Sequence, residues 1–280
     1  MPIRTDLALE TREMFAEEIS GVESKAQDND GITVTHVRIT TDEGAQRIGK
    51  PKGNYVTIEL DEMLVQNEDV SDRASESVCN ELKKLIVSKN AESVLIVGLG
   101  NRYITPDSIG PKTVAQIAVT RHITKEVGNG YDFSVRAVSA ITPGVMGITG
   151  IETSEIVRGV TEHVNPSLII VVDALAARSI ERLGTTVQLS DTGISPGSGV
   201  GNNRKELTEK TMGVPVIAIG VPMVVDAMTL AMDITGNSEI TDNVLSRRSK
   251  NMIVTPNDVD AISEKISAII ADGINMALHS

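Results

Sequence analysis

Two acidic residues stand where apolar, strand-like runs of the sequence give way to other patterns. The run 94–98 leads through a polar turn to Asp107, and the run 168–172 is followed at once by Asp173. In open parallel sheets, ligands bind outside the carboxyl ends of the strands. We therefore expect both carboxyl groups at the same edge of one sheet.

A close pair of carboxyl groups can hydrolyse a peptide bond. Like charges keep both members from ionising together, so one is ionised and the other keeps its proton. The ionised member takes a proton from water, and the other hydrogen-bonds the carbonyl oxygen as it becomes an oxyanion. Position alone leaves an alternative open, in which Asp107 and Asp173 each cap a following helix.

Other short motifs compete with this pair. Asp191-Thr192-Gly193 matches pepsin-like and retroviral proteases, but it occurs once, in a chain that is not small and all-β. Gly193-Ile194-Ser195-Pro196-Gly197 matches a nucleophile elbow, yet Pro196 lacks the N–H that the oxyanion hole needs. The glycine-rich stretches 98–100 and 197–201 suit a dinucleotide or another anion, but we interpret both as tight turns.

The elements that position these residues indicate one α/β domain over residues 7–280. A third continuous apolar run covers residues 214–220, and helical patterns separate the three runs. This order is typical of a mostly parallel sheet flanked by helices. Near the end of the chain, Thr255 as N-cap and Pro256 at the first helical position predict the start of a C-terminal helix.

The N-terminal part has a different pattern. The run 32–39 has a strand-like composition, and the run 55–60 shows the alternation of a half-buried strand. They predict a small β-containing extension at about residues 30–60 of the domain. The polar stretch 23–31 before them is interpreted as a loop.

Composition and charge exclude several classes of function. The chain has 280 residues and a formal net charge of −12, so we expect no direct binding to nucleic acid or to a membrane. Cys79 is the only cysteine, which indicates a reducing compartment. There is no secretory or membrane-spanning pattern, so a cytoplasmic location is expected. The four histidines lack a His-Glu-x-x-His spacing, and we expect neither a metal nor a cofactor.

Several long and unusual blocks of the sequence carry a resemblance to one family. They are Ile3-Arg4-Thr5-Asp6-Leu7-Ala8, Lys52-Gly53-Asn54-Tyr55, Leu95-Ile96-Val97-Gly98-Leu99-Gly100-Asn101, Thr105-Pro106-Asp107, Thr120-Arg121-His122, residues 143–154, residues 173–182 and residues 190–202. Over nearly the whole chain these blocks resemble the germination proteases of spore-forming Firmicutes, of a clostridial type.

This resemblance implies an α/β endopeptidase of the spore core that assembles as a tetramer. Its substrates would be the small acid-soluble proteins that coat DNA in the dormant spore. Two aspartates are catalytic in the family, and by motif they fall on Asp107 and Asp173. One departure stands out, since most of a long family segment is missing near residues 240–250.

The resemblance also implies a zymogen that cuts itself. Family substrates are cut after the first acid of a stretch reading Thr, Glu, apolar, Ala, Ser or Thr, Glu. Thr5-Asp6-Leu7-Ala8-Leu9-Glu10 follows that pattern except at Leu9. We therefore predict cleavage between Asp6 and Leu7, which removes a prosegment of residues 1–6. The alternative is that Thr5 and Asp6 cap a first helix.

Two other functions stay open at this point. The expected fold is similar to that of hydrogenase-maturation peptidases, in which acidic residues at sheet edges hold a metal. A metal-assisted peptidase is therefore the first alternative. The second alternative is a non-catalytic protein that binds anions in its glycine-rich turns.

Overall fold

A computed structural model describes residues 5–29, 31–60, 68–87, 89, 91–123, 136–200, 204–235 and 252–279. One mixed sheet runs through this part of the chain. Its strands are β1 (Val22–Asn29), β2 (Ile32–Ile39), β3 (Gly53–Glu59), β4 (Ser93–Gly98), β5 (Ala137–Ile141), β6 (Leu168–Ala177), β7 (Thr186–Ser190), β8 (Val216–Asp226) and β9 (Ile253–Val254). The order is β1-β2-β3-β7-β8-β6-β4-β5, and β9 pairs with β8.

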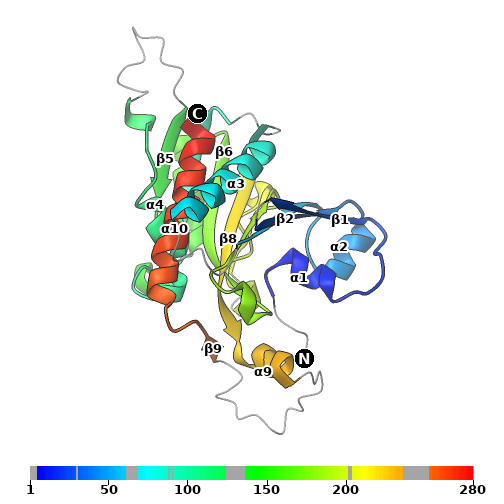
Figure 1. Cartoon of the computed structure of the whole chain (residues 1–280). Coiled ribbons are helices and arrows are strands. Elements are labelled where there is room, and N and C mark those ends of the chain that lie inside the picture. Colours follow the sequence, from blue (N-terminus) through cyan, green and yellow to red (C-terminus); the bar gives the residue numbers. More distant parts are fainter. Residues whose placement is uncertain are drawn as a thin grey trace.

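Helices surround this sheet. They are α1 (Ala8–Glu13), α2 (Asp42–Ile48), α3 (Glu68–Val87), α4 (Ile109–Val114), α6 (Met146–Thr149), α7 (Thr153–Val164), α8 (Glu209–Met212), α9 (Ala227–Thr235) and α10 (Val259–His279), with 3-10 turns η2 (Thr105–Asp107), η3 (Ile180–Arg182) and η4 (Ser198–Val200). In Figure 1, α3 and α10 lie over the same face of the sheet, and α1 and α2 lie beside the N-terminal strands.

The parallel strands form the centre of the fold. β5, β4, β6 and β8 are mutually parallel, and alternate residues of each strand enter different cores. Val94, Ile170 and Ile217 pack with α3 and α10, whereas Leu95 and Ile169 pack with α7 and α8 on the opposite face. Burial on both faces explains the continuous apolar runs in the sequence. The predicted α/β class, with a mostly parallel core flanked by helices, is confirmed.

The other half of the sheet is antiparallel. β7 joins β8 to β3, and β2 and β1 follow in antiparallel pairs. The interpretation of residues 23–31 as a loop was wrong, because residues 22–29 form β1. Nearly all of that strand is exposed, so no face of it needs apolar residues and the alternation that marks a strand is missing.

The strands of the parallel block do not end level. The last pair between β4 and β6 joins Gly98 to Val172, while β6 continues to Ala177 with only β8 beside it. The apolar run suggested that Asp173 follows the end of a strand. Asp173 instead lies inside β6. The carboxyl end of β4 and this overhang of β6 form the edge at which the candidate site is built.

The last helix begins later than its sequence signals predict. α10 starts at Val259, and Thr255 does not cap it, since its Oγ1 donates to Met223 O at 2.9 Å. This hydrogen bond connects the segment before α10 to β8. The hydroxyl group of Thr255 is used in this tertiary contact and not as a helix cap. Among the described helices, none combines the length and the apolar character needed to cross a bilayer.

Candidate active site

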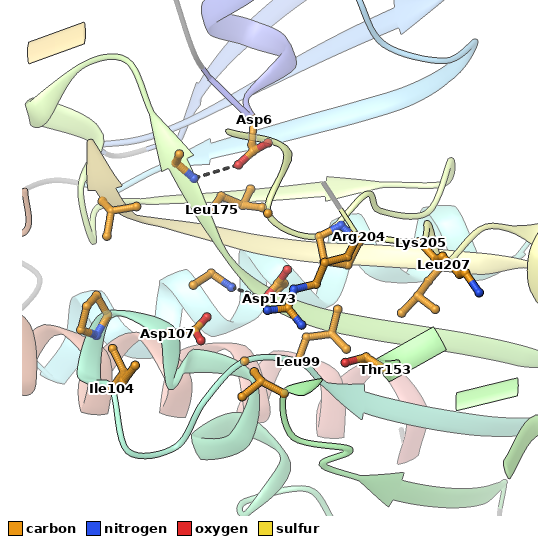
Figure 2. Close-up of a pocket in the computed structure, with 18 of the residues that line it drawn as sticks. Asp6, Leu99, Ile104, Asp107, Thr153, Asp173, Leu175, Arg204, Lys205 and Leu207 are labelled. Atoms are coloured by element: carbon orange, nitrogen blue, oxygen red, sulfur yellow. Dashed lines mark hydrogen bonds between the residues drawn. The ribbon is translucent and has the colours of Figure 1, made fainter. Parts of the chain in front are cut away.

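Asp107 and Asp173 line one cavity of about 260 Å³ at this sheet edge. Asp107 comes from η2, which follows β4, and Asp173 comes from the overhang of β6. Figure 2 shows both carboxyl groups in the cavity, with Arg204 reaching toward Asp173 from the other wall. The sequence prediction that the two aspartates share one sheet edge is confirmed in this geometric sense.

A tight turn holds Asp107 in place. Gly100 has a φ of 105°, and a Cβ there would lie 2.0 Å from the backbone oxygen of Asp107, so only glycine fits. The next N–H, of Asn101, donates to Asp107 Oδ2 at 2.9 Å. Asp107 is therefore not the cap of α4, whose N-cap residue is Ser108.

Asp173 is almost fully buried, with 5% of its surface exposed. Its Oδ1 accepts a hydrogen bond from the N–H of Ala174 at 2.9 Å. It pairs across the sheet with Gly220 of β8, and no helix starts after it. The helix-cap alternative fails for Asp173 as it does for Asp107.

Burial and charge divide the roles of the two aspartates. The pKa of Asp173 is raised well above its usual range, first by burial and then by the negative charges of Asp107 and Asp6. Burial also raises the pKa of Asp107, but the N–H of Asn101 and the charge of Arg204 oppose that rise. Of the two carboxyl groups, Asp173 therefore keeps its proton to the higher pH.

Two residues of the cavity were missed by the sequence analysis. Arg204 Nη1 and Glu152 Oε1 are buried and have no hydrogen-bond partner among the described residues. Both line the cavity. Buried polar atoms are usually paired, so these two atoms are open to a ligand in the cavity. Both lie in or next to unusual blocks of the sequence. Thr149 and Glu152 match a capping box in the sequence, but Glu152 is itself the N-cap residue of α7 and no side chain caps that helix.

Comparison with known proteins decides the family. A family model described as germination protease matches residues 4–238. The germination protease of Caldanaerobacter subterraneus is 44% identical over 99% of this chain and 94% of its own length. Those of Clostridium perfringens and Bacillus subtilis are 45% and 40% identical, over 99% of this chain and 95% and 93% of their lengths.

This chain belongs to the germination protease family. It is accordingly an endopeptidase, with a role in spore germination. The alignment with the Bacillus protein spans 345 positions, more than the 280 residues of this chain, so that relative has residues without a counterpart here. The gap predicted near residues 240–250 lies outside the described residues.

A solved structure was also found. The [NiFe] hydrogenase maturation protease of Thermococcus kodakarensis is 15% identical, with a TM-score of 0.38, and the match covers 69% of this chain and 98% of that one. A likeness this weak supports no conclusion about the function of the present chain.

The N-terminal segment of this germination protease family member is docked at the same site. Asp6 lines the cavity of the aspartate pair, and its N–H donates to Ala176 O at 2.9 Å. Leu7 is fully buried, in a cluster with Leu175 and other apolar residues. Leu7 is also the N-cap residue of α1, and no side chain caps that helix. The alternative in which Thr5 and Asp6 cap a first helix is therefore not realised.

The competing motifs have other roles. Asp191 accepts hydrogen bonds from Asn54 N and Asn54 Nδ2, both at 2.8 Å, and so fastens β3 to the end of β7. Ser195 is exposed. In the glycine-rich stretch that begins at Gly197, Ser198 Oγ donates to the carboxyl group of Asp6, at 2.6 Å from Oδ1. In the part of the chain that is described, no three His, Cys, Asp or Glu side chains are grouped as metal ligands.

The buried Asp173 predicts a change in stability. Its pKa is higher in the folded chain than in the unfolded one, so ionisation costs folding free energy. This cost is absent below the ordinary pKa of about 3.9 and complete above the raised pKa. We expect Asp173→Asn to raise Tm at neutral pH by at least about 2–4 °C, the shift given by 1 kcal/mol, and by less near pH ~4.

Scanning calorimetry at the two pH values measures this difference. Asp272→Asn is the matched control, because Asp272 is exposed on α10. A lower Tm for Asp173→Asn than for wild type at neutral pH would contradict this account, because it would show that the buried carboxyl group of Asp173 does not cost folding free energy.

Proposed function

We propose that this protein is made as a zymogen and, once processed, degrades small acid-soluble spore proteins with its two aspartates. The observation that carries the proposal is the Asp107–Asp173 pair, two carboxyl groups in one cavity, of which Asp173 has the more strongly raised pKa. A general acid and a general base with separated pKa values are what hydrolysis of a peptide bond by water requires.

The reaction uses both members of the pair. Asp107 takes a proton from water as the water oxygen bonds to the scissile carbonyl carbon. Asp173 gives its proton to the carbonyl oxygen, which yields a neutral tetrahedral diol. Asp107 then protonates the leaving nitrogen while the C–N bond breaks, and Asp173 recovers its proton from one diol hydroxyl. The pair ends in its starting state.

Arg204 supports this chemistry as a positive charge beside the pair. Its charge favours the ionised form of Asp107, and its Nη1 is free to donate to a substrate oxygen, since no described residue accepts from it. A donor aimed at developing negative charge in a buried site stabilises the transition state strongly.

Digestion of a purified small acid-soluble spore protein tests the proposal. Mass spectrometry is expected to show fragments cut after an acidic residue, in equal yield with and without a chelator. Absence of fragments would refute the substrate, and loss of cleavage with chelator, restored by added divalent metal, would favour the metal-assisted alternative.

We also propose that the chain works as a homo-tetramer. Met146, Ile148 and Ile151, in and after α6, are large apolar residues that are 47–57% exposed. A grouped apolar surface of this kind supports burial between subunits. Light scattering at micromolar concentration should give the mass of four chains, and a monomer would contradict it.

A further inference from the structure

The carboxylate of Asp6 lies in a cradle built by β6 and η4. Its Oδ2 accepts a hydrogen bond from the N–H of Ala176 at 2.9 Å, and its Oδ1 accepts one from Ser198 Oγ at 2.6 Å. Gly199 closes the cradle, since a Cβ there would lie 2.2 Å from Oδ2. Hydrogen bonds to an ionised acceptor are stronger than neutral ones. The cradle is therefore shaped and polarised for a carboxylate.

The backbone beside the cradle is an open strand edge. Val172 O accepts from Leu99 N at 2.8 Å. The pairing of β6 with β8 shifts register between Leu175 and Ala176, and the N–H and C=O of Ala176 are directed to Asp6. β4 has already ended there, and Asp6 takes both groups of Ala176. An extended peptide can add to a free edge in this way, with side chains entering pockets.

A lysine stands near the same position. Lys50 and Asp6 both line a second cavity, of about 190 Å³. Burial lowers the pKa of Lys50, and the negative charge of Asp6 partly opposes that shift. Lys50 makes no ion pair with any residue in the described ranges. The second cavity thus offers a lysine side chain without an ion-pair partner among the described residues, beside the short side chain of Asp6.

We propose that this cradle, with Lys50 in the adjoining cavity, is the subsite that binds the acidic residue preceding the scissile bond of a substrate. In the uncleaved chain Asp6 fills it, and the substrate strand adds to the free edge of β6 once Asp6 has left. Lys50 lines a cavity that Asp6 also lines, so a glutamate, one methylene longer than Asp6, has this lysine in its neighbourhood. The assignment rests on the proposed function and adds the residues that set its specificity.

The test compares two peptides, Thr-Glu-Leu-Ala-Ser-Glu and the same sequence with Gln at its second position. For the processed enzyme we expect kcat/KM to be about tenfold or more higher for the Glu peptide, the worth of a hydrogen bond to a charged group. Ser198→Ala and Lys50→Met should each bring the ratio toward one by slowing the Glu peptide. Lys52→Met, which removes an exposed lysine paired with Asp42, should keep the wild-type ratio.

A binding readout separates this assignment from the peptidase itself. Full-length chain carrying Asp6→Ala and Asp107→Asn is titrated into each peptide, fluorescently labelled, and anisotropy is followed. Tighter binding of the Glu peptide, lost on adding Ser198→Ala, is expected even if neither peptide is cleaved by wild type. Equal affinity for the two peptides, no binding, or a Glu/Gln ratio that survives both Ser198→Ala and Lys50→Met would overturn the assignment.

Discussion

Asp107→Asn and Asp173→Asn are each expected to abolish peptide cleavage while leaving the fold intact. Asparagine keeps the shape of each side chain, including the oxygen that accepts from Asn101 N or Ala174 N. It can neither take a proton from water nor deliver one to the carbonyl oxygen. Loss of one acid–base group lowers kcat by about 10²–10⁴. Because neither variant is expected to process itself, kcat is measured on wild-type and variant chains that are all expressed from Leu7 onward.

Two controls make this result specific. Asp272→Asn removes an exposed carboxyl on α10 and should leave kcat unchanged. Ser195→Ala should be tolerated far better than either aspartate variant, because Pro196 denies that serine an oxyanion hole. Wild-type kcat in either Asp107→Asn or Asp173→Asn would remove that residue from the mechanism.

The second large effect concerns the N-terminus, where we expect self-cleavage between Asp6 and Leu7 at mildly acid pH. The protonated fraction of Asp173 rises as pH falls, because its pKa is raised in the folded chain. Asp6 already lines the cavity of the pair. Intact mass should show loss of residues 1–6, and N-terminal sequencing should begin at Leu7.

The docked segment sets a condition on this reaction. Leu7 is fully buried and Asp6 is bonded to Ala176 and Ser198, so the bond must shift within the site before water can attack it. Asp107→Asn should remain at full length under the same conditions. A wild-type chain that keeps Met1, or an Asp107→Asn chain that is processed equally, would rule out cleavage by the pair.

The sequence predicted the parts of this site that depend on local patterns. Continuous apolar runs marked β4, β6 and β8, and the rule for ligands at strand ends directed attention to Asp107 and Asp173. The patterns did not show that β6 continues past Asp173. That extension depends on the pairing of β6 with β8, a tertiary contact that an apolar run in the sequence does not predict.

The rest of the site is assembled from distant segments. Arg204 and Ser198 come from the segment between β7 and α8, and Lys50 comes from the turn between α2 and β3. No spacing in the sequence predicts that these segments meet near the aspartates. The 197–201 stretch was interpreted as a tight turn, although its serine binds the carboxylate of Asp6. The hydrogen bond between Ser198 and Asp6 joins residues that are far apart in the sequence, so it can be seen only in the folded structure.

The pH dependence of kcat/KM for the processed wild-type enzyme tests most directly whether one aspartate acts ionised and the other protonated. Asp107 must be ionised and Asp173 protonated, so activity should fall at low pH as Asp107 gains a proton. It should fall again at higher pH as Asp173 loses its own. A bell-shaped profile with both limbs is the expected result. Activity that keeps rising between about pH 7 and 9 would contradict catalysis by this pair.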